Sequence, residues 1–168
     1  MKEIKYQPIG IIRTPHKTAE GTPIQPKGAK GIKGEVEVYS QYEEGLKDLE
    51  GFSHIILLFH CHLSGNYSLK QKPYMDKEEH GIFAMRGPSR PNPIGLSIVK
   101  LDDVKGNILE IENVDIIDET PLLDIKPYIP EFDQNQVESI GWLAENVQKL
   151  SETRDDGRFL EEDKNSSP

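Results

Sequence analysis

The chain has one cysteine, no apolar run of membrane-spanning length and fewer basic than acidic residues. Cys61 has no partner for an internal disulfide, so we expect a protein of a reducing compartment. No segment approaches the roughly 20 apolar residues that a transmembrane helix needs. The charged start, residues 1–5, is not followed by the apolar segment of a signal peptide. The sequence therefore predicts a cytoplasmic protein without a membrane partner.

Several common catalytic and nucleotide-binding motifs are also missing. The chain has no GxxxxGK phosphate loop and no CxxC pair, and neither Ser89 nor Ser97 lies beside a histidine in a nucleophile-elbow motif. Gly28, Gly31 and Gly34 recur at every third position. They do not follow a strand and open a helix, as the glycines of a dinucleotide fingerprint do. These absences argue against a phosphate-loop or Rossmann nucleotide site and against covalent catalysis by serine.

Charge is distributed unevenly along the chain. The net charge of -9 argues weakly against a nucleic-acid partner. Residues 1–33 nevertheless hold seven Lys or Arg against two Asp or Glu, whereas residues 131–168 hold four against ten. The basic N-terminal third can face a phosphate backbone, or the charges can serve solubility alone. Charge by itself leaves both interpretations open.

Most of the 168 residues read as short strands separated by turns, in a chain whose length suits one domain. Apolar and alternating segments predict strands over 6–14, 35–39, 52–62, 81–85, 94–101, 108–111, 114–117 and 122–125, with a short helix over 41–49. A turn at Gly106-Asn107 joins two of these strands. Strands about ten residues apart with few helices between them predict a mainly β fold, an antiparallel barrel or a sandwich.

One further helix is predicted near the end of the chain, over residues 134–151. Asp133 can cap it, with Gln136 as the capping-box partner. The apolar residues on its predicted inner face are Val137, Ile140, Leu143, Val147 and Leu150. Residues 152–168 are polar and acidic, which is typical of a flexible tail. The predicted organisation is a β domain over 1–133, the helix, and the tail.

The most distinctive segment is a proline-rich loop over residues 86–95. Its prolines fix their own φ angles and restrict the residues before them, so Asn92 is held extended between two rings. Arg86 and Arg90 flank the loop with planar, permanently charged donor groups. Such a loop is either a stiff structural turn or a rigid holder for a ligand, and its residues alone allow both interpretations.

Three histidines fall on one predicted strand. His54, His60 and His62 are spaced by even numbers of residues and so share one face, with Cys61 on the other. Imidazoles at i and i+2 can bind a metal ion, with His80 as a further candidate ligand. The alternative is a polar face of hydrogen-bonded histidines, and we expect no metal.

Carboxylates cluster between residues 115 and 128. Asp124 and Lys126 share one strand face, either as a surface ion pair or as the polar wall of a cleft. Asp115 and Asp118 lie just upstream, and their oxygens can accept hydrogen bonds from the hydroxyl groups or the amine of a ligand. This region is therefore a second candidate for a binding site.

Several segments resemble the TsaA/TrmO-like family over about residues 6–133. They are Ile9-Gly-Ile-Ile-Arg-Thr-Pro15, Phe52-Ser-His-Ile55, Gly81-Ile-Phe-Ala-Met-Arg86, Arg90-Pro-Asn-Pro-Ile-Gly95 and Thr120-Pro-Leu-Leu-Asp-Ile-Lys-Pro-Tyr128. The resemblance implies a small antiparallel β-barrel that binds S-adenosylmethionine without a Rossmann sheet. It also implies a homodimer whose site lies near the subunit interface. The implied reaction is methylation of the N6 amine of threonylcarbamoyladenosine, next to the tRNA anticodon.

The resemblance further implies which residues form the site. The expected cofactor contacts are Pro23, Ile24, Gln25, His60, Cys61, Arg86, Leu96, Glu112, Asn113, Val114 and Asp115. Asp115 or Asp118 is expected to accept a proton from the amine. The expected substrate contacts are Arg90, Asn92, Asp124, Lys126 and Tyr128.

Three residues depart from the family pattern. Ile24 stands where arginine is frequent, Gly87 where serine is usual, and Glu119 where glycine is usual. Position 24 thus lacks a cation that could face RNA, and position 119 carries an additional anion. These changes weaken the expectation that the protein acts on RNA more than the expectation that it binds the cofactor. Two alternatives follow: an S-adenosylmethionine-binding protein without catalytic activity, or a small metal-dependent barrel enzyme that uses the histidines.

Overall fold

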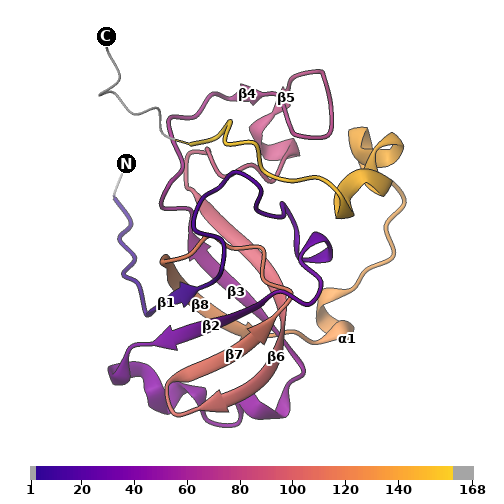
Figure 1. Ribbon diagram of the computed structural model, residues 1–168. Coiled ribbons are helices and arrows are strands. Elements are labelled where there is room, and N and C mark those ends of the chain that lie inside the picture. The colour runs from indigo at the N-terminus through magenta and orange to yellow at the C-terminus, as the bar shows by residue number, and fades with distance from the viewer. Residues whose placement is uncertain (1–2, 161–168) are drawn as a thin grey trace.

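Alternating apolar side chains close six antiparallel strands into a barrel (Figure 1). The computed structural model describes residues 3–160. The barrel strands are β1 (Gly10–Arg13), β2 (Lys33–Val38), β3 (His54–His60), β6 (Ile94–Lys105), β7 (Ile108–Glu112) and β8 (Thr120–Pro127). Their order around the barrel is β1-β2-β7-β6-β3-β8, and all pairs are antiparallel. The mainly β prediction and its antiparallel barrel are confirmed.

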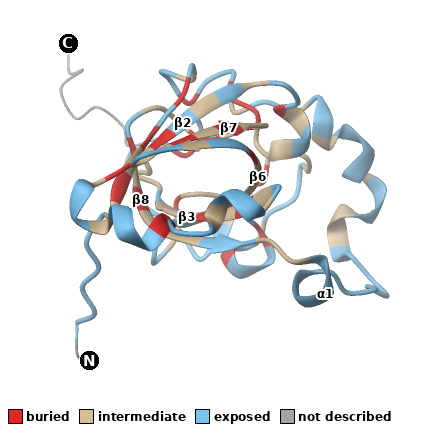
Figure 2. Cartoon of the chain, turned by 90° about the horizontal axis from the view of Figure 1, so that it is seen from below, coloured by how far each residue is buried: buried red, intermediate tan, exposed pale blue. Residues whose placement is uncertain are grey.

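The core fills the barrel interior, as the buried residues of Figure 2 show. In β2, Val36 and Val38 are buried, while Glu35 and Glu37 point outward. The same period of two buries Leu109 in β7. This alternation lets each strand present one face to the core and the other to solvent.

The β6–β7 hairpin turns where the sequence predicts it. Gly106 has φ +60°, in the left-handed region that glycine enters without a steric penalty. Asn107 closes the turn by donating from its side-chain amide to the carbonyl of Val38, at 2.7 Å. Gly106 therefore shapes the turn between β6 and β7, and Asn107 ties that turn to the end of β2.

The remaining elements are short. Strands β4 (Lys70–Gln71) and β5 (His80–Gly81) form a two-stranded sheet, and α1 spans Pro130–Asp133. The 3₁₀ segments are Pro26–Gly28, Ser40–Leu46, Leu49–Gly51, Ile82–Ala84, Gly141–Glu145 and Val147–Ser151. In the described part of the chain, no helix is both long and apolar enough to cross a bilayer.

The continuous helix predicted over 134–151 is wrong. Residues 134–140 are irregular, and two 3₁₀ segments follow. Gly141 has φ +60°, in the left-handed region, which a continuous α-helix through this position would not allow. Val137 and Ile140, expected on the buried face, are 71% and 45% exposed. The apolar spacing is real, but most of these side chains have no core to pack against.

The flexible tail predicted from residue 152 is also wrong as far as residue 160. Phe159 is buried, and its carbonyl oxygen accepts from the backbone N–H of Gly65 at 2.9 Å and from Ser89 Oγ at 2.7 Å. Residues 161–168 lie outside the described part of the chain. The segment up to 160 is thus packed on the domain.

Two predicted strands are not formed. Residues 81–85 contain the end of β5 and a 3₁₀ turn that buries Ile82. Residues 114–117 alternate as predicted, with Val114 and Ile116 buried, but pair with no strand. Their backbone instead contacts loops, since Val114 N–H donates to Ile32 and the carbonyl of Ile116 accepts from Thr14 Oγ1. Alternation predicts burial correctly there, although strand pairing does not follow from it.

Candidate functional site

A cavity of about 570 Å³ opens at one end of the barrel. Its floor is made by the end of β3, the start of β6, residues 115–117 and Thr120 at the start of β8. The walls come from the loops 19–25, 61–64, 73–75 and 83–88 and from residues 142–160. Segments from across the whole sequence therefore meet at one place.

Asp115 is a half-buried carboxylate in this cavity, which Asp155 also lines. Ser97 Oγ donates to its Oδ1 at 2.6 Å. Burial raises the pKa of Asp115 from 3.8 to about 6, against the opposing effects of the Ser97 hydrogen bond and the charge of Arg86. At neutral pH the carboxylate is ionised in an apolar setting, which makes it a strong hydrogen-bond acceptor and a competent base.

Arg86 lies at the solvent-exposed edge of the same cavity. Its Nη1 is 3.5 Å from Gln25 Oε1, so the proline-rich loop and the loop 19–25 meet here. A guanidinium and a side-chain amide at the rim can hold an anionic or polar end of a ligand. The interior beyond them is mainly apolar.

Cys61 and His62 line the cavity but are poorly suited to covalent chemistry. Burial raises the pKa of the Cys61 thiol to about 11, so the thiol stays protonated at neutral pH. Burial and the neighbouring His60 lower the pKa of His62, whose Nδ1 is 3.3 Å from Thr120 Oγ1. Both side chains therefore act as neutral wall groups.

The aromatic floor depends on a glycine. The pairing of β3 with β8 shifts register between Leu58 and Phe59. The Phe59 ring then lies next to Gly95 of β6, where an added Cβ would overlap the ring. Register irregularities next to a site redirect a side chain, and here the redirected ring is part of the cavity.

The proline-rich loop is held from within. Arg90 Nη1 donates to the carbonyls of Met85 at 3.3 Å and Gly87 at 3.4 Å, and buried Ser89 bonds the carbonyl of Phe159. Residues 85–88 of the same loop line the cavity. The two interpretations of this loop are therefore compatible, because a stiff turn also forms a cavity wall.

The comparison with known proteins identifies the family. Residues 11–134 match the family described as the tRNA-methyltransferase O N-terminal domain. The chain belongs to this family. It is 57% identical over 157 residues to a probable S-adenosyl-L-methionine-binding protein of Pyrococcus abyssi, covering 94% of this chain and 85% of that protein.

Two other relatives extend the comparison. The tRNA (adenine(37)-N6)-methyltransferase of Escherichia coli is 36% identical over 140 residues, which is 77% of this chain and 60% of that enzyme. A crystal structure of TrmO from Pseudomonas aeruginosa superposes with a TM-score of 0.70 at 34% identity, covering 84% of this chain and 63% of that one. This chain thus spans less than two thirds of either methyltransferase.

The cavity brings together seven of the expected cofactor contacts. They are Pro23, Ile24, Gln25, Cys61, Arg86, Leu96 and Asp115. The other four do not line it. His60 is exposed at the end of β3, and Val114 is fully buried in the barrel core. Glu112 pairs with Lys100 at 3.4 Å.

Asn113 has a positioning role in the structure. It adopts φ +68°, and its Oδ1 accepts from the backbone N–H of Gly31 at 2.9 Å. Its own N–H donates to the carbonyl of Ile32. These bonds fix the turn that leads from β7 to Asp115, so Asn113 supports the cavity from behind.

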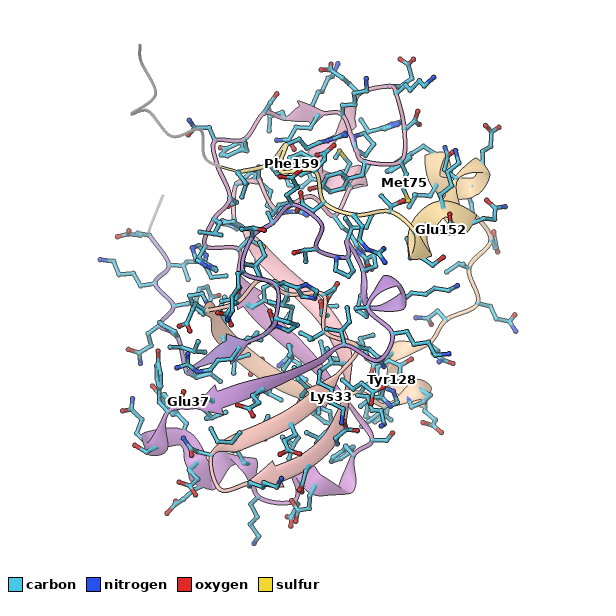
Figure 3. The ribbon with its side chains drawn as sticks, viewed as in Figure 1. Lys33, Glu37, Met75, Tyr128, Glu152 and Phe159 are labelled. Carbon is cyan, nitrogen blue, oxygen red and sulfur yellow. The ribbon has the colours of Figure 1, made fainter. Side chains whose placement is uncertain are left out.

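The expected substrate contacts lie outside the cavity. Asp124 and Lys126 form an exposed ion pair of 2.7 Å on β8. Tyr128 accepts from Gln134 Nε2 at 2.9 Å, and Figure 3 places it well away from Phe159 and Met75 of the cavity region. Asn92 is exposed, with its carbonyl oxygen bonded to the N–H of Ile94. Nothing in this arrangement brings these groups to Asp115.

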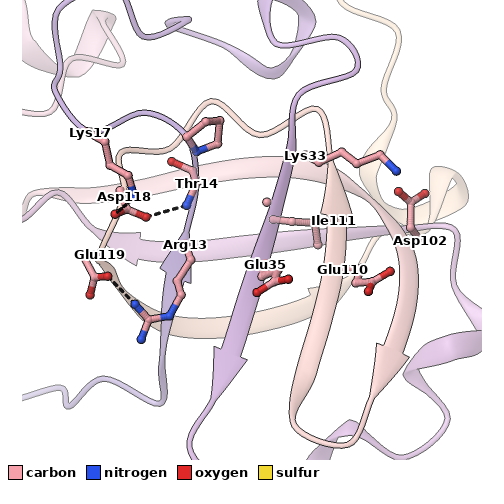
Figure 4. A pocket seen from close by; sticks show the side chains of 12 residues that line it. Arg13, Thr14, Lys17, Lys33, Glu35, Asp102, Glu110, Ile111, Asp118 and Glu119 are labelled. Atoms are coloured by element: carbon pink, nitrogen blue, oxygen red, sulfur yellow. Dashed lines mark hydrogen bonds and ion pairs between the residues drawn. The ribbon is translucent and has the colours of Figure 1, made fainter.

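Asp118 lies in a second, open pocket on the side of the barrel (Figure 4). It pairs with Lys17, and its Oδ1 accepts from the backbone N–H of Thr14 at 2.8 Å. Although partial burial opposes the change, these donors lower the pKa of Asp118. A carboxylate held this way is a weaker base than Asp115, and it lines the second pocket rather than the main cavity.

The structure places each of the three residues that depart from the family pattern. Glu119 adopts φ +60°, which glycine reaches most easily, and it pairs with Arg13 in the second pocket. Ile24 is an apolar wall residue of the main cavity. Gly87 lies under the ring of Phe159, where a Cβ would be 3.5 Å from the nearest ring atom.

The histidines do not assemble a metal site. Over residues 3–160 there is no group of three or more His, Cys, Asp or Glu side chains placed to hold a metal ion. His54 packs edge-on against Tyr128, with ring centroids 6.4 Å apart. His80 Nε2 is 3.0 Å from Asp76 Oδ2. His54 and His80 are thus each held by a contact to another side chain.

Sequence reasoning missed several cavity residues. Ser97 was considered only as a nucleophile, whereas in the structure it bonds Asp115. The aromatic and apolar residues missed are Phe59, Tyr74, Phe83, Trp142, Leu143, Leu150 and Phe159. Residues 142–159 carry an apolar spacing typical of a helix and then an acidic composition typical of a tail, and neither pattern points to a cavity wall.

Proposed function

We propose that the protein binds S-adenosylmethionine in the main cavity and transfers its methyl group to a tRNA. One observation supports the cofactor most directly. Residues 23–25, Cys61, Arg86, Leu96 and Asp115, separated by up to 92 positions, line one cavity. These positions are the ones that family resemblance associates with the cofactor, and homologues bear the name of S-adenosyl-L-methionine-binding proteins.

The proposed acceptor is the N6 amine of threonylcarbamoyladenosine beside the anticodon. The nitrogen lone pair attacks the methyl carbon, the carbon–sulfur bond breaks with its electrons going to sulfur, and the nitrogen loses a proton. Aligning the two reactants can supply roughly 7–11 kcal/mol of the barrier. Asp115 is our candidate proton acceptor, because it is the buried, ionised carboxylate of the cavity.

An anticodon loop suits this site better than a duplex. Its bases are already unpaired, so presenting one costs less than flipping a base out of a helix. The basic residues of the N-terminal third include Lys27 and Lys30, both exposed and close in sequence to the cavity wall 23–25. They offer phosphate contacts in a chain that is otherwise acidic.

We also propose a homodimer with the cavity near the interface, as family resemblance implies. Exposed apolar side chains beside the cavity support this proposal. Phe83 is 78% exposed, Leu96 49% and Ile94 44%. Light scattering coupled to size-exclusion chromatography tests it: a mass of about twice 19.0 kDa agrees with a dimer, and the monomer mass contradicts it.

A second candidate function is cofactor binding without methyl transfer. Asp118 and Glu119 neutralise Lys17 and Arg13, which removes two cations from possible RNA contacts. Relatives from Pyrococcus abyssi and Archaeoglobus fulgidus are named for cofactor binding alone. This candidate keeps the cavity and its ligand but lacks the tRNA substrate.

A methyl-transfer assay separates the two candidates. The protein is incubated with deuterium-labelled S-adenosylmethionine and tRNA carrying threonylcarbamoyladenosine, and the digested nucleosides are analysed by mass spectrometry. A labelled methyl group on that nucleoside supports the methyltransferase, with Asp115→Asn as the variant expected to lose most of the product. Absence of label, with cofactor binding intact, supports the binding protein.

A further inference from the structure

Residues 141–160 lie beyond the family domain, which matches only up to residue 134, yet they form one side of the cavity. Their lining side chains are Trp142, Leu143, Leu150, Asp155, Phe159 and Leu160. Five of these six are apolar, whereas the polar groups Asp115, Ser97 and Arg86 belong to the family domain. The family domain thus supplies the polar groups Asp115, Ser97 and Arg86 along with apolar ones, and this segment adds a mainly apolar side.

The segment is attached at its end to two loops that also line the cavity. The backbone of Asp155 exchanges two hydrogen bonds of 2.8 Å with Gly21 and Thr22. Phe159 is buried edge-on against Tyr74, with centroids 5.1 Å apart. Figure 1 shows the segment crossing the end of the barrel beside β5. This attachment fixes residues 155–160 firmly.

Trp142 makes the attachment at the other end. Its ring stacks on His80 with centroids 4.5 Å apart and planes 13° apart, and its Nε1 donates to the carbonyl of Ala84 at 2.8 Å. His80 is held in turn by Asp76. The indole is therefore positioned at the cavity by contacts that do not depend on a ligand.

The portion between the two attachments is weakly held. Residues 144–149 comprise the end of one 3₁₀ segment, Asn146, and the start of the next, and neither segment contains a buried residue. Short 3₁₀ turns with few buried contacts open at low free-energy cost. A ligand can enter or leave the cavity when this part moves and Trp142 releases its contacts.

We propose that residues 141–160 form a cover over the cofactor, which contacts the bound ligand and slows its release. The proposal rests on the proposed function, since it assumes that S-adenosylmethionine occupies the cavity. It assigns to Trp142 a positioning role that the family domain does not supply. Trp142 is the single tryptophan of the chain, so its fluorescence reports on the cover alone.

Two measurements on the full chain test the cover. Titration with S-adenosylmethionine is followed by Trp142 fluorescence and, separately, by calorimetry. Rapid filtration, after excess unlabelled cofactor is added to protein loaded with radiolabelled S-adenosylmethionine, gives the release rate for the wild type and for Trp142→Ala, which lacks the fluorescent reporter. We expect the fluorescence of Trp142 to change saturably, with the same midpoint as the calorimetric titration. We expect the cofactor to be released at least five-fold faster from Trp142→Ala than from the wild type.

Phe132→Ala is the matched control. It removes an aromatic side chain of α1 that is 76% exposed and lies outside the cavity, and it should release the cofactor at the wild-type rate.

The outcomes are distinguishable. Calorimetric binding with unchanged Trp142 fluorescence, or with release accelerated less than five-fold in Trp142→Ala, overturns the cover and leaves the proposed function standing. Absence of calorimetric binding overturns both. Leu150→Ala guards against misfolding of the Trp142 variant, because it removes a cover contact from the other 3₁₀ segment and should also accelerate release.

Discussion

Asp115 combines burial, a short hydrogen bond and a cavity position. Desolvation disfavours its charged form, so the folded protein retains a proton to higher pH than the unfolded chain does. The associated stabilisation is complete below pH 3.8 and is lost as the pH rises through about 6. This residue therefore lowers stability at neutral pH, which is typical of groups kept for function.

The variant Asp115→Asn tests this environment. Asparagine keeps the shape and can still accept from Ser97, but it carries no charge to desolvate. Between pH 4 and 7 its free energy of unfolding should rise relative to wild type by up to about 3 kcal/mol. Urea denaturation at a series of pH values measures the difference. A difference that does not change with pH contradicts the assigned burial.

Cys61 should be nearly inert toward alkylation. Raising its pKa from 9.0 to about 11 lowers the thiolate fraction at pH 7.5 by about 100-fold. Iodoacetamide labelling, followed by intact mass, should be slow in the folded protein and complete in denaturant. Because Cys61 lines the cavity, S-adenosylmethionine should slow labelling further. Rapid labelling of the folded protein would show that the thiol is exposed.

At the scale of elements, the contact between β3 and β6 shapes the floor of the cavity. A Cβ at Gly95 would overlap the Phe59 ring, so Gly95→Ala must displace that ring or the strand. We expect a loss of about 1–3 kcal/mol in stability and weaker cofactor binding. Gly45→Ala, where no heavy atom lies within 4 Å of the added Cβ, is the control and should change stability by less than about 0.5 kcal/mol. Equal behaviour of the two variants is incompatible with this packing.

The sequence predicts strands correctly where apolar and polar residues alternate in a segment that also has neighbouring strands to pair with. Val36 and Leu109 follow a period of two in segments that pair on both sides. Val114 and Ile116 follow the same period, but their segment lies at the barrel end and bonds only loops. Local sequence specifies which face is buried, whereas strand pairing depends on where the chain is placed by distant segments.

The C-terminal elements show the limit of periodicity. The spacing of Val137, Ile140 and Leu143 fits a helix, but a helix also needs an apolar surface to cover. Gly141 turns the chain at that point, and Leu143 contacts the cavity. Which residues line the site likewise depends on the tertiary structure. Family resemblance implies Arg86 and Asp115, which line the cavity, while Trp142 and Phe159 reach it only through the fold of the end of the chain.

For the whole molecule, the charge distribution predicts how tRNA is held. Lys27 and Lys30 are exposed near the cavity, whereas Lys105 ends β6 at the far end of the barrel and pairs with Glu110 (Figure 1). Replacing Lys27 and Lys30 by alanine should weaken tRNA binding and reduce the salt slope by about 1 per lost phosphate contact. Cofactor affinity should not change.

Filter binding at several salt concentrations measures both quantities. Lys105→Ala, which removes one cation as each single substitution at Lys27 or Lys30 does, serves as the control for the single variants and should leave tRNA affinity unchanged. A larger loss for Lys105→Ala than for the Lys27 and Lys30 variant would place the tRNA on a different face of the molecule.

The central claim is that the cavity between the barrel end and residues 141–160 holds S-adenosylmethionine. Calorimetric titration of the full chain with the cofactor tests it most directly, with Arg86→Ala as the site variant. The account predicts one site per chain, competition by S-adenosylhomocysteine, and at least ten-fold weaker binding in the variant, about 1.4 kcal/mol. Absence of binding at millimolar cofactor, or equal affinity in the variant, would contradict it.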